Sequence, residues 1–141
     1  MKNEQESEEN RIKEDPSSLG ESREGLSQDR VVFDREGLLY RLMGDDELVE
    51  EIADDFINQI PINMEALRKS LDQKDAHQVK REAHIIKGSA GNVGALVLQD
   101  IAKKIEAAGA SEDLNTAESY FMQFVAQLDV FKNELNRLFH P

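Results

Sequence analysis

Apolar residues recur at spacings of three and four from about residue 31 to the C-terminus, and this periodicity limits the possible folds more than any other feature. The clearest run lies near the C-terminal end: Ala117, Phe121, Phe124, Leu128, Phe131, Leu135 and Leu138. Such spacing is typical of one face of an amphipathic α-helix, and no segment shows the period-two alternation of a strand. The sequence therefore predicts an all-α domain.

Two helices upstream of that run have recognisable ends. Asp34 suits the N-cap of a short helix that Gly44 would stop. A longer helix follows, with acidic residues at its start that suit the positive end of the helix dipole. Its apolar residues lie four apart, at Leu48, Ile52, Phe56 and Ile60. Pro61 is expected to kink or restart this helix, because proline has no N–H to donate.

Two more helices precede the C-terminal run. Asp75 is the expected N-cap of the first, whose seam of mostly small residues comprises Ala76, Val79, Ala83, Ile86 and Ala90. The second runs from about Ala95 to Ala108, and its apolar seam comprises Leu98, Ile101, Ile105 and Ala108. Long helices with short connections predict an antiparallel four-helix bundle over residues 31–141, with the short helix added at its N-terminal side. One bundle of this length closes its own core, so we expect a monomer.

Residues 1–30 differ in composition from the rest of the chain. They are rich in Glu, Ser, Asn and Lys and contain hardly any large apolar residue. A segment of this kind cannot bury enough surface to offset the entropy of ordering it. We expect residues 1–30 to be a flexible acidic tail or an interdomain linker.

Charge and cysteine content exclude several classes of function. The formal net charge of −12 argues against nucleic acid as a partner, because such binding depends on cations that neutralise phosphates, and it disfavours an anionic membrane surface. The absence of cysteine excludes disulfides, thiolate metal sites and cysteine nucleophiles. No apolar run approaches a membrane span, and the N-terminus lacks the apolar core of a signal peptide. A cytoplasmic protein is expected.

The segment AHIIKGSAGNVGA, residues 83–95, places glycine inside an otherwise helical pattern. Gly88 costs the helix about 1 kcal/mol relative to alanine. By helical phase His84 lies beside the core seam, with Lys87 and Gly88 one turn on. Gly88 removes the side chain that would cover the space next to the imidazole, and Lys87 would attract anionic oxygens. These features suit a phosphoryl acceptor.

This segment resembles the signature of histidine-containing phosphotransfer (HPt) domains of bacterial multistep phosphorelays: His, two apolar or small positions, Lys-Gly, and Gly94 six residues later. The likeness extends from about Val32 to Phe139, through FDREGLLYRLMGDDELVEEIADDFI, ALRKSLDQKDAHQVKREAH and LQDIAKKIEAAGA. It implies that Nε2 of His84 accepts a phosphoryl group from the aspartate of a receiver domain and passes it reversibly to another receiver. The linker-like N-terminal stretch favours an origin in a hybrid sensor kinase.

The resemblance also implies roles for the neighbours of His84. The receiver would supply Mg²⁺ and an acidic pocket, so no cofactor of this chain's own is expected, and Lys87 would steady the phosphoryl oxygens. Family members often hold the Nδ1 proton with Gln or Glu on the next helix. Glu106 is either that partner or ordinary helix surface. Ile85, where the family is often polar, would form an apolar docking rim or pack under the short first helix.

The other histidines and glycines have structural explanations. His77 lies two turns before His84, but Arg81 at i+4 would crowd its approach, so we expect it to face solvent. His140 is expected to have no role at the C-terminus. Gly94 suits the end of a helix. No Glu stands three residues before any histidine, and no HExxH is present, so neither a di-iron nor a zinc site is expected.

Two alternative functions remain. One is a helical adaptor that binds a receiver without chemistry. The other is the kinase-borne phosphoacceptor domain of chemotaxis systems, which takes phosphate from an ATP-bound kinase domain. The intact His84, Lys87 and Gly88 favour a covalent carrier, and the linker-like stretch favours receivers as its partners. The chain has no Gly-x-x-x-x-Gly-Lys loop, so no kinase activity of its own is expected.

Overall fold

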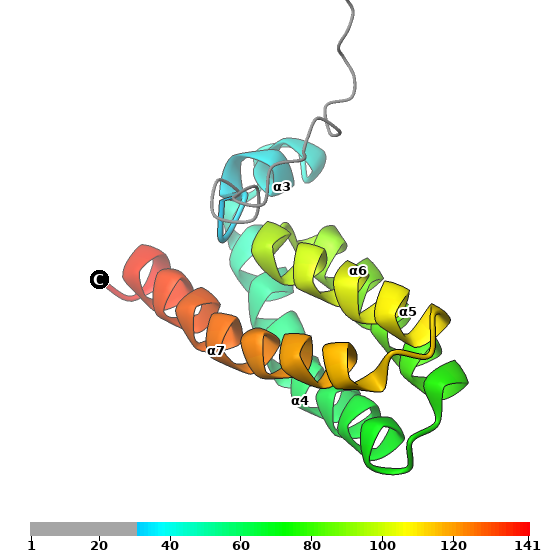
Figure 1. Ribbon diagram of the computed structural model, residues 1–141. Helices are drawn as coiled ribbons and strands as arrows, with labels where there is room; N and C mark the ends of the chain where they lie inside the picture. The colour runs from blue at the N-terminus through cyan, green and yellow to red at the C-terminus, as the bar shows by residue number, and fades with distance from the viewer. Residues whose placement is uncertain (1–30) are drawn as a thin grey trace, which may run out of the picture. The chain divides into compact units, whose positions relative to one another are not determined.

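The computed structural model describes residues 31–141, and the tail expected over residues 1–30 lies outside them. The described residues form helices and no β-strand (Figure 1). The helices are α3 (Arg35–Arg41), α4 (Asp46–Asp72), α5 (Ala76–Val93), α6 (Leu96–Ala110) and α7 (Leu114–Phe139). Among these helices, none has the length and hydropathy needed to cross a bilayer. The prediction of four long helices with a short one before them is confirmed.

The four long helices form a closed ring of neighbours. α4 packs on α5, α5 on α6 and α6 on α7, and α7 returns to α4 (Figure 1). Connections of two or three residues join consecutive helices, which forces each pair to run antiparallel. The result is the predicted antiparallel bundle.

Aspartate begins four of the five described helices. Asp34, Asp45, Asp75 and Asp113 each accept a hydrogen bond from the backbone N–H three residues on. An N-cap of this kind contributes about 1 kcal/mol. Gly94 ends α5 with a φ of +83°, in the left-handed region that favours glycine. The predicted caps at Asp34 and Asp75 and the predicted stop at Gly94 are confirmed.

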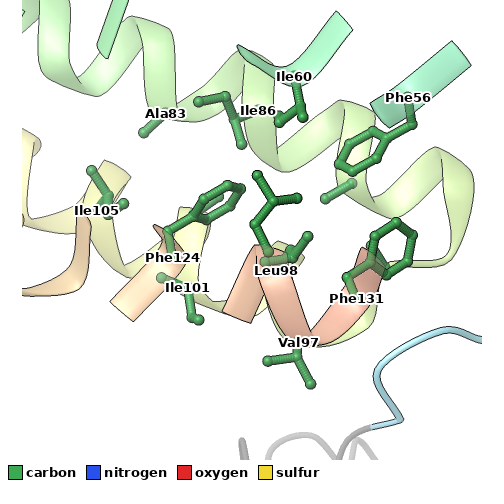
Figure 2. Close-up of a cluster of buried hydrophobic side chains, with 14 of the residues drawn as sticks. Phe56, Ile60, Ala83, Ile86, Val97, Leu98, Ile101, Ile105, Phe124 and Phe131 are labelled. Carbon is green, nitrogen blue, oxygen red and sulfur yellow. The ribbon is translucent and has the colours of Figure 1, made fainter. Parts of the chain in front are cut away.

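The core lies between the four long helices, and each contributes side chains to it (Figure 2). The seams predicted for the helices now labelled α5, α6 and α7 are buried almost completely. Phe131 is fully buried, and its ring meets those of Phe33 and Phe56 edge-on, with centroids 5.7 and 5.5 Å away. Edge-on aromatic pairs add to the stability gained from burial alone.

The buried seam of α4 differs from the predicted one. Leu48 and Ile52 are only partly buried. In the half of α4 before Pro61 the buried residues are Val49, Ala53, Phe56 and Ile60. Four residues turn through about 400°, so a strict four-residue repeat drifts around the helix, whereas alternating fours and threes stays on one face. The prediction was right for Phe56 and Ile60 and wrong for Leu48 and Ile52, because it followed the fours alone.

α4 also continues through Pro61 without a break, so the predicted restart is wrong. Proline cannot donate the hydrogen bond that would reach the carbonyl of Ile57. Pro61 lies on the exposed side of α4, where water can take the place of the missing donor. Ile60 packs into the core on the other side and holds the helix in place.

Hydrogen bonds join the short helix α3 and its N-cap to the end of the bundle where α5 meets α6. The N–H of Asp34 donates to the carbonyl of Gly94 at 2.8 Å, and the Arg41 guanidinium donates to the carbonyl of Asn92 at 3.1 Å. Phe33, just before α3, is buried in the aromatic cluster. α3 therefore covers the C-terminal end of α5.

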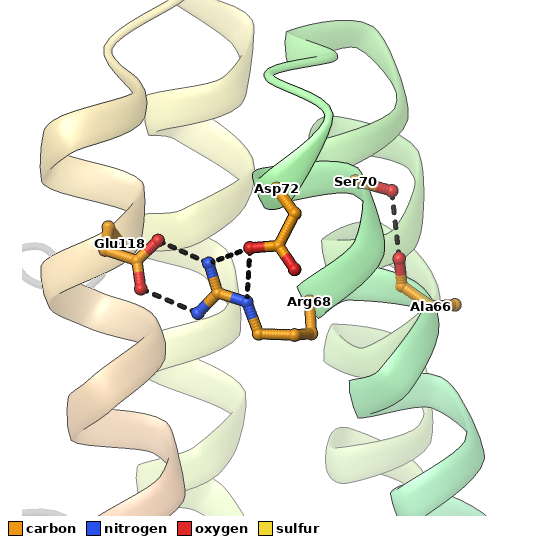
Figure 3. Close-up of polar contacts among 5 residues, drawn as sticks. All are labelled: Ala66, Arg68, Ser70, Asp72 and Glu118. Carbon is orange, nitrogen blue, oxygen red and sulfur yellow. Dashed lines mark hydrogen bonds and ion pairs between the residues drawn. The ribbon is translucent and has the colours of Figure 1, made fainter.

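Toward the opposite end, Arg68 joins α4 to α7 (Figure 3). Its guanidinium donates two hydrogen bonds of 2.6 Å to Glu118 and one of 3.1 Å to Asp72. Its central carbon lies 4.9 Å from the centre of the Phe121 ring. The hydrogen bonds from Arg68 hold the pKa of Glu118 below its ordinary value, against the opposing effect of partial burial. This group of contacts is an interhelical clamp.

We expect Arg68→Met to lower the free energy of unfolding by about 1 kcal/mol near neutral pH, because a bidentate ion pair with an aromatic contact exceeds an ordinary surface pair. Urea unfolding followed by circular dichroism measures the change. The Glu118 contribution is fully present above its unfolded-state pKa and is lost as the pH falls through the lowered folded-state pKa. The difference between variant and wild type should therefore shrink in acid.

Arg137→Met is the matched control, because it removes an exposed pair with Glu134 within one helix. Its expected cost is only about 0.2–0.5 kcal/mol. Equal losses in the two variants would contradict the clamp.

Candidate functional site

His84 lies on the outer flank of α5, beside the buried residues Ala83 and Ile86. Its side chain is 66% exposed. The residue is in the middle of a helix that runs from the Asp75 cap to Gly94, so its backbone is held on both sides by regular hydrogen bonding. The structure places the imidazole at the surface, as the helical phase predicted.

Glu106 on α6 joins His84 to Lys87. One carboxylate oxygen, Oε2, lies 2.8 Å from Nδ1 of His84, and the other, Oε1, lies 2.7 Å from Nζ of Lys87. The side chains of Glu106 and Lys87 are 20% and 29% exposed. The structure therefore brings together three residues that the sequence singled out, and Glu106 is not ordinary solvent-facing helix surface.

The ionisation of Glu106 fixes which ring nitrogen of His84 carries a proton. Partial burial opposes its negative charge, but hydrogen bonds and charges from Lys87 and His84 outweigh burial and hold the pKa of Glu106 below its ordinary value. An ionised carboxylate can only accept hydrogen bonds, so Nδ1 must donate. In the neutral imidazole the free lone pair is then on Nε2.

Gly88 leaves the surface of α5 open one turn after His84. The residue is exposed, and a Cβ added to it would meet no atom within 4 Å. A long side chain at this position would project over the turn that carries His84, because helical side chains point toward the N-terminus of their helix. The geometry agrees with the open approach expected from the sequence.

The remaining candidate residues lie outside this cluster. Ile85 is 47% exposed, which argues against packing under α3, and its place in a docking rim stays a prediction. His77 is exposed two turns earlier, with Arg81 at i+4. Nε2 of His140 lies 3.8 Å from a carboxylate oxygen of Glu50. Over residues 31–141, no three or more His, Cys, Asp or Glu side chains are grouped so that they could hold a metal ion.

Gly109 allows α5 and α6 to approach closely near the site. A Cβ added to it would lie 2.8 Å from the backbone nitrogen of Lys80 and 3.1 Å from the carbonyl oxygen of Ala76. Gly109 is one turn from Glu106, and Lys80 is one turn from His84. The sequence offered little sign of this role, because Gly109 is only one of the small residues in the run AAGA of a periodic helix.

We expect Gly109→Ala to separate α5 from α6 and weaken the contact between His84 and Glu106, because backbone atoms cannot give way as a flexible side chain can. Overpacking of this kind costs about 1–3 kcal/mol. The fraction of His84 protonated on Nδ1, measured by ¹⁵N NMR of the folded variant, should fall. Gly88→Ala is the control, since its Cβ has room and should leave that fraction unchanged. An unaltered tautomer in Gly109→Ala would contradict this role.

Comparison with known proteins gave three matches. The family model of the Hpt domain matches residues 51–139. The phosphorelay intermediate protein rdeA of Dictyostelium discoideum is 29% identical over 101 residues, which cover 71% of this chain and 40% of that protein. The chain thus matches less than half the length of this relative. Histidine-containing phosphotransfer protein B (HptB) of Pseudomonas aeruginosa PAO1 has a crystal structure that matches with a TM-score of 0.67 at 23% identity, over 75% of this chain and 96% of that one. The last match shows that the two chains share a fold.

Proposed function

This chain belongs to the Hpt domain family, whose members are histidine phosphotransfer intermediates of phosphorelays, and from that premise we propose that it carries the phosphoryl group on His84. Hpt domains interact with receiver domains in phosphorelays. We propose that a phosphorylated receiver aspartate is the donor and that the aspartate of a second receiver is the acceptor. Because each step is reversible, the direction of flow follows the supply of phosphorylated receiver.

In the proposed reaction the Nε2 lone pair of His84 attacks the phosphorus of the receiver's acyl phosphate. An N–P bond forms, the P–O bond to the aspartate breaks, and its electron pair returns to the aspartate carboxylate. The ring keeps its proton on Nδ1 and becomes positively charged. The carboxylate of Glu106, 2.8 Å from Nδ1, stabilises that charge. Transfer to the second receiver reverses these changes.

One observation carries the proposal: the imidazole of His84 is bonded to Glu106 through Nδ1 while most of its side chain stays exposed. Glu106 orients Nδ1, the side chain is 66% exposed, and Gly88 leaves room beside it. A histidine with a purely structural role would have no need of an open second nitrogen. A receiver, which must bring its aspartyl phosphate to the ring, does need this access.

The two proteins would contribute different groups to the reaction. We propose that the receiver supplies Mg²⁺ and the acidic pocket, while this chain supplies the nucleophile and its orientation. On this account the protein needs no cofactor of its own and has no kinase activity of its own. We further propose that it acts in the cytoplasm as a monomer.

Transfer from purified receiver domains tests the proposal. Each receiver of the host is phosphorylated with a small-molecule donor that carries ³²P, freed of the donor, and mixed with this protein. We expect label to move to this protein from a small number of receivers. An adaptor would bind a receiver and take no label. A chemotaxis-type phosphoacceptor would take label only from an ATP-bound kinase domain. Either of these outcomes would contradict the proposal.

A further inference from the structure

Lys87 is bound to Glu106 before any phosphoryl group is present. Its Nζ lies 2.7 Å from Oε1, and its side chain is only 29% exposed although it lies on the outer part of α5. The Glu106 carboxylate contacts the Nδ1 edge of the His84 ring. Transfer would take place at Nε2, the other ring nitrogen. The ammonium group of Lys87 is therefore bound next to Nδ1 of His84, and not next to Nε2.

The two oxygens of Glu106 have separate partners, and this fixes the direction of the carboxylate. Lys87 binds Oε1, which leaves Oε2 directed at Nδ1 of His84. A carboxylate with one partner could rotate and present either oxygen, or turn toward water. The contact with Lys87 also links α5 to α6 one turn from His84. The ion pair thus restricts both the rotamer of Glu106 and its distance from the ring.

Lys87 also favours the ionised form of Glu106, which can only accept a hydrogen bond. Partial burial favours the neutral carboxyl group, and the contacts with Lys87 and His84 overcome this and lower the pKa of Glu106. A protonated Glu106 could donate to Nδ1, which would place the ring proton on Nε2 and remove the nucleophilic lone pair. The contact with Lys87 thus adds to the preference of Glu106 for the ionised, accepting form.

We propose that Lys87 is a positioning residue that acts through Glu106, holding the carboxylate so that the His84 proton stays on Nδ1, instead of binding the phosphoryl oxygens directly. The inference rests on the proposed function and refines it. It departs from the role that the sequence resemblance implied for Lys87.

The tautomer of His84 in the unphosphorylated protein gives the first test. It is read from ¹⁵N chemical shifts at a pH of about 8.5, above the ordinary titration range of imidazole. We expect Lys87→Met to reduce the Nδ1–H fraction and Lys87→Arg, which keeps the charge and the donors, to preserve it. Lys80→Met is the control, because it removes an exposed lysine one turn before His84. An unchanged tautomer in folded Lys87→Met would overturn the proposal.

A double-mutant cycle on the transfer rate gives the second test. Lys87→Met and Glu106→Ala are each expected to slow transfer about tenfold, by analogy with the lower end of the cost of losing a residue that orients a metal-bound histidine. If Lys87 acts through Glu106, the double variant should be no slower than the slower single variant. Losses that multiply to about a hundredfold would instead indicate direct contact of Lys87 with the phosphoryl group, and would overturn the proposal.

The two readouts separate this inference from the proposed function. The tautomer is measured without any receiver, so it tests the link between Lys87 and His84 on its own. If the wild-type protein takes label from no receiver, the proposed function fails whatever the tautomer shows. If the wild type transfers normally and Lys87→Met keeps its tautomer, only the inference fails.

Discussion

His84→Gln is expected to lose phosphoryl transfer from a phosphorylated receiver completely, while His77→Gln transfers at close to the wild-type rate. The glutamine amide has no basic lone pair to attack phosphorus, so no covalent intermediate can form. The His84 side chain is 66% exposed, so its replacement should leave the fold intact. Incorporation of ³²P from a labelled receiver, followed over time on gels, measures both variants.

His77 is a demanding control because it shares so much with His84. It lies on the same helix about 10 Å away, is exposed, and has Lys80 at i+3. It differs in having Arg81 where His84 has Gly88, and the described contacts give it no partner equivalent to Glu106. If His84→Gln still took label and His77→Gln did not, His77 would be the phosphoryl acceptor and this account would be wrong.

Gly88→Gln should slow transfer at least about tenfold while making the protein more stable. Glycine inside a helix is less favourable than glutamine, and a Cβ at this position meets no atom within 4 Å, so the free energy of unfolding should rise by roughly 0.5–1 kcal/mol. The longer side chain would occupy the space through which a receiver approaches His84. Stopped transfer reactions and urea unfolding measure the two effects independently.

The opposite signs of these two effects make the experiment decisive. A mutation that merely damaged the fold would reduce both quantities. Gly88→Ala provides an intermediate case, with the gain in stability but little added bulk, and should slow transfer much less. A wild-type rate in Gly88→Gln would show that receivers do not approach over this turn of α5.

Much of the fold could be predicted because the position and the buried face of a helix depend mainly on residues that are close together in the sequence. The three-and-four spacing located the core faces of α5, α6 and α7, and Asp34, Asp75 and Gly94 marked helix ends. The same periodicity placed His84 outside the seam and next to Lys87 and Gly88. Each of these statements depends only on residues within a few turns of one another. The bundle followed because short connections leave amphipathic helices few other ways to pack.

The features that escaped prediction depend on contacts between helices. The path of α4 through Pro61 reflects which side of the helix faces water, and this is known only once Ile60 is packed in the core. Glu106 lies 22 residues from His84, and only the family resemblance, not the local pattern, suggested that they meet. The place of Gly109 against the backbone of Lys80 requires the spacing of α5 and α6.

The binding of Lys87 to Glu106 could not be anticipated for the same reason. Lys87 and His84 share one helix, so the sequence could place them on one face, but it could not show that a carboxylate from α6 lies between the lysine and the ring. A lysine that is already paired with a carboxylate has a different chemistry from a free cation near a phosphate. The contact is the reason why we propose a different role for Lys87 within the same group of residues.

The central claim is that His84 carries the phosphoryl group on Nε2 while Glu106 holds the proton on Nδ1. NMR of the ¹⁵N-labelled protein after transfer from a receiver tests this directly, because a one-bond coupling between ³¹P and ¹⁵N identifies the nitrogen that is phosphorylated. We predict that coupling at Nε2 of His84, with Nδ1 still protonated. A coupling at Nδ1, or a phosphoryl group on any other residue, would contradict the account.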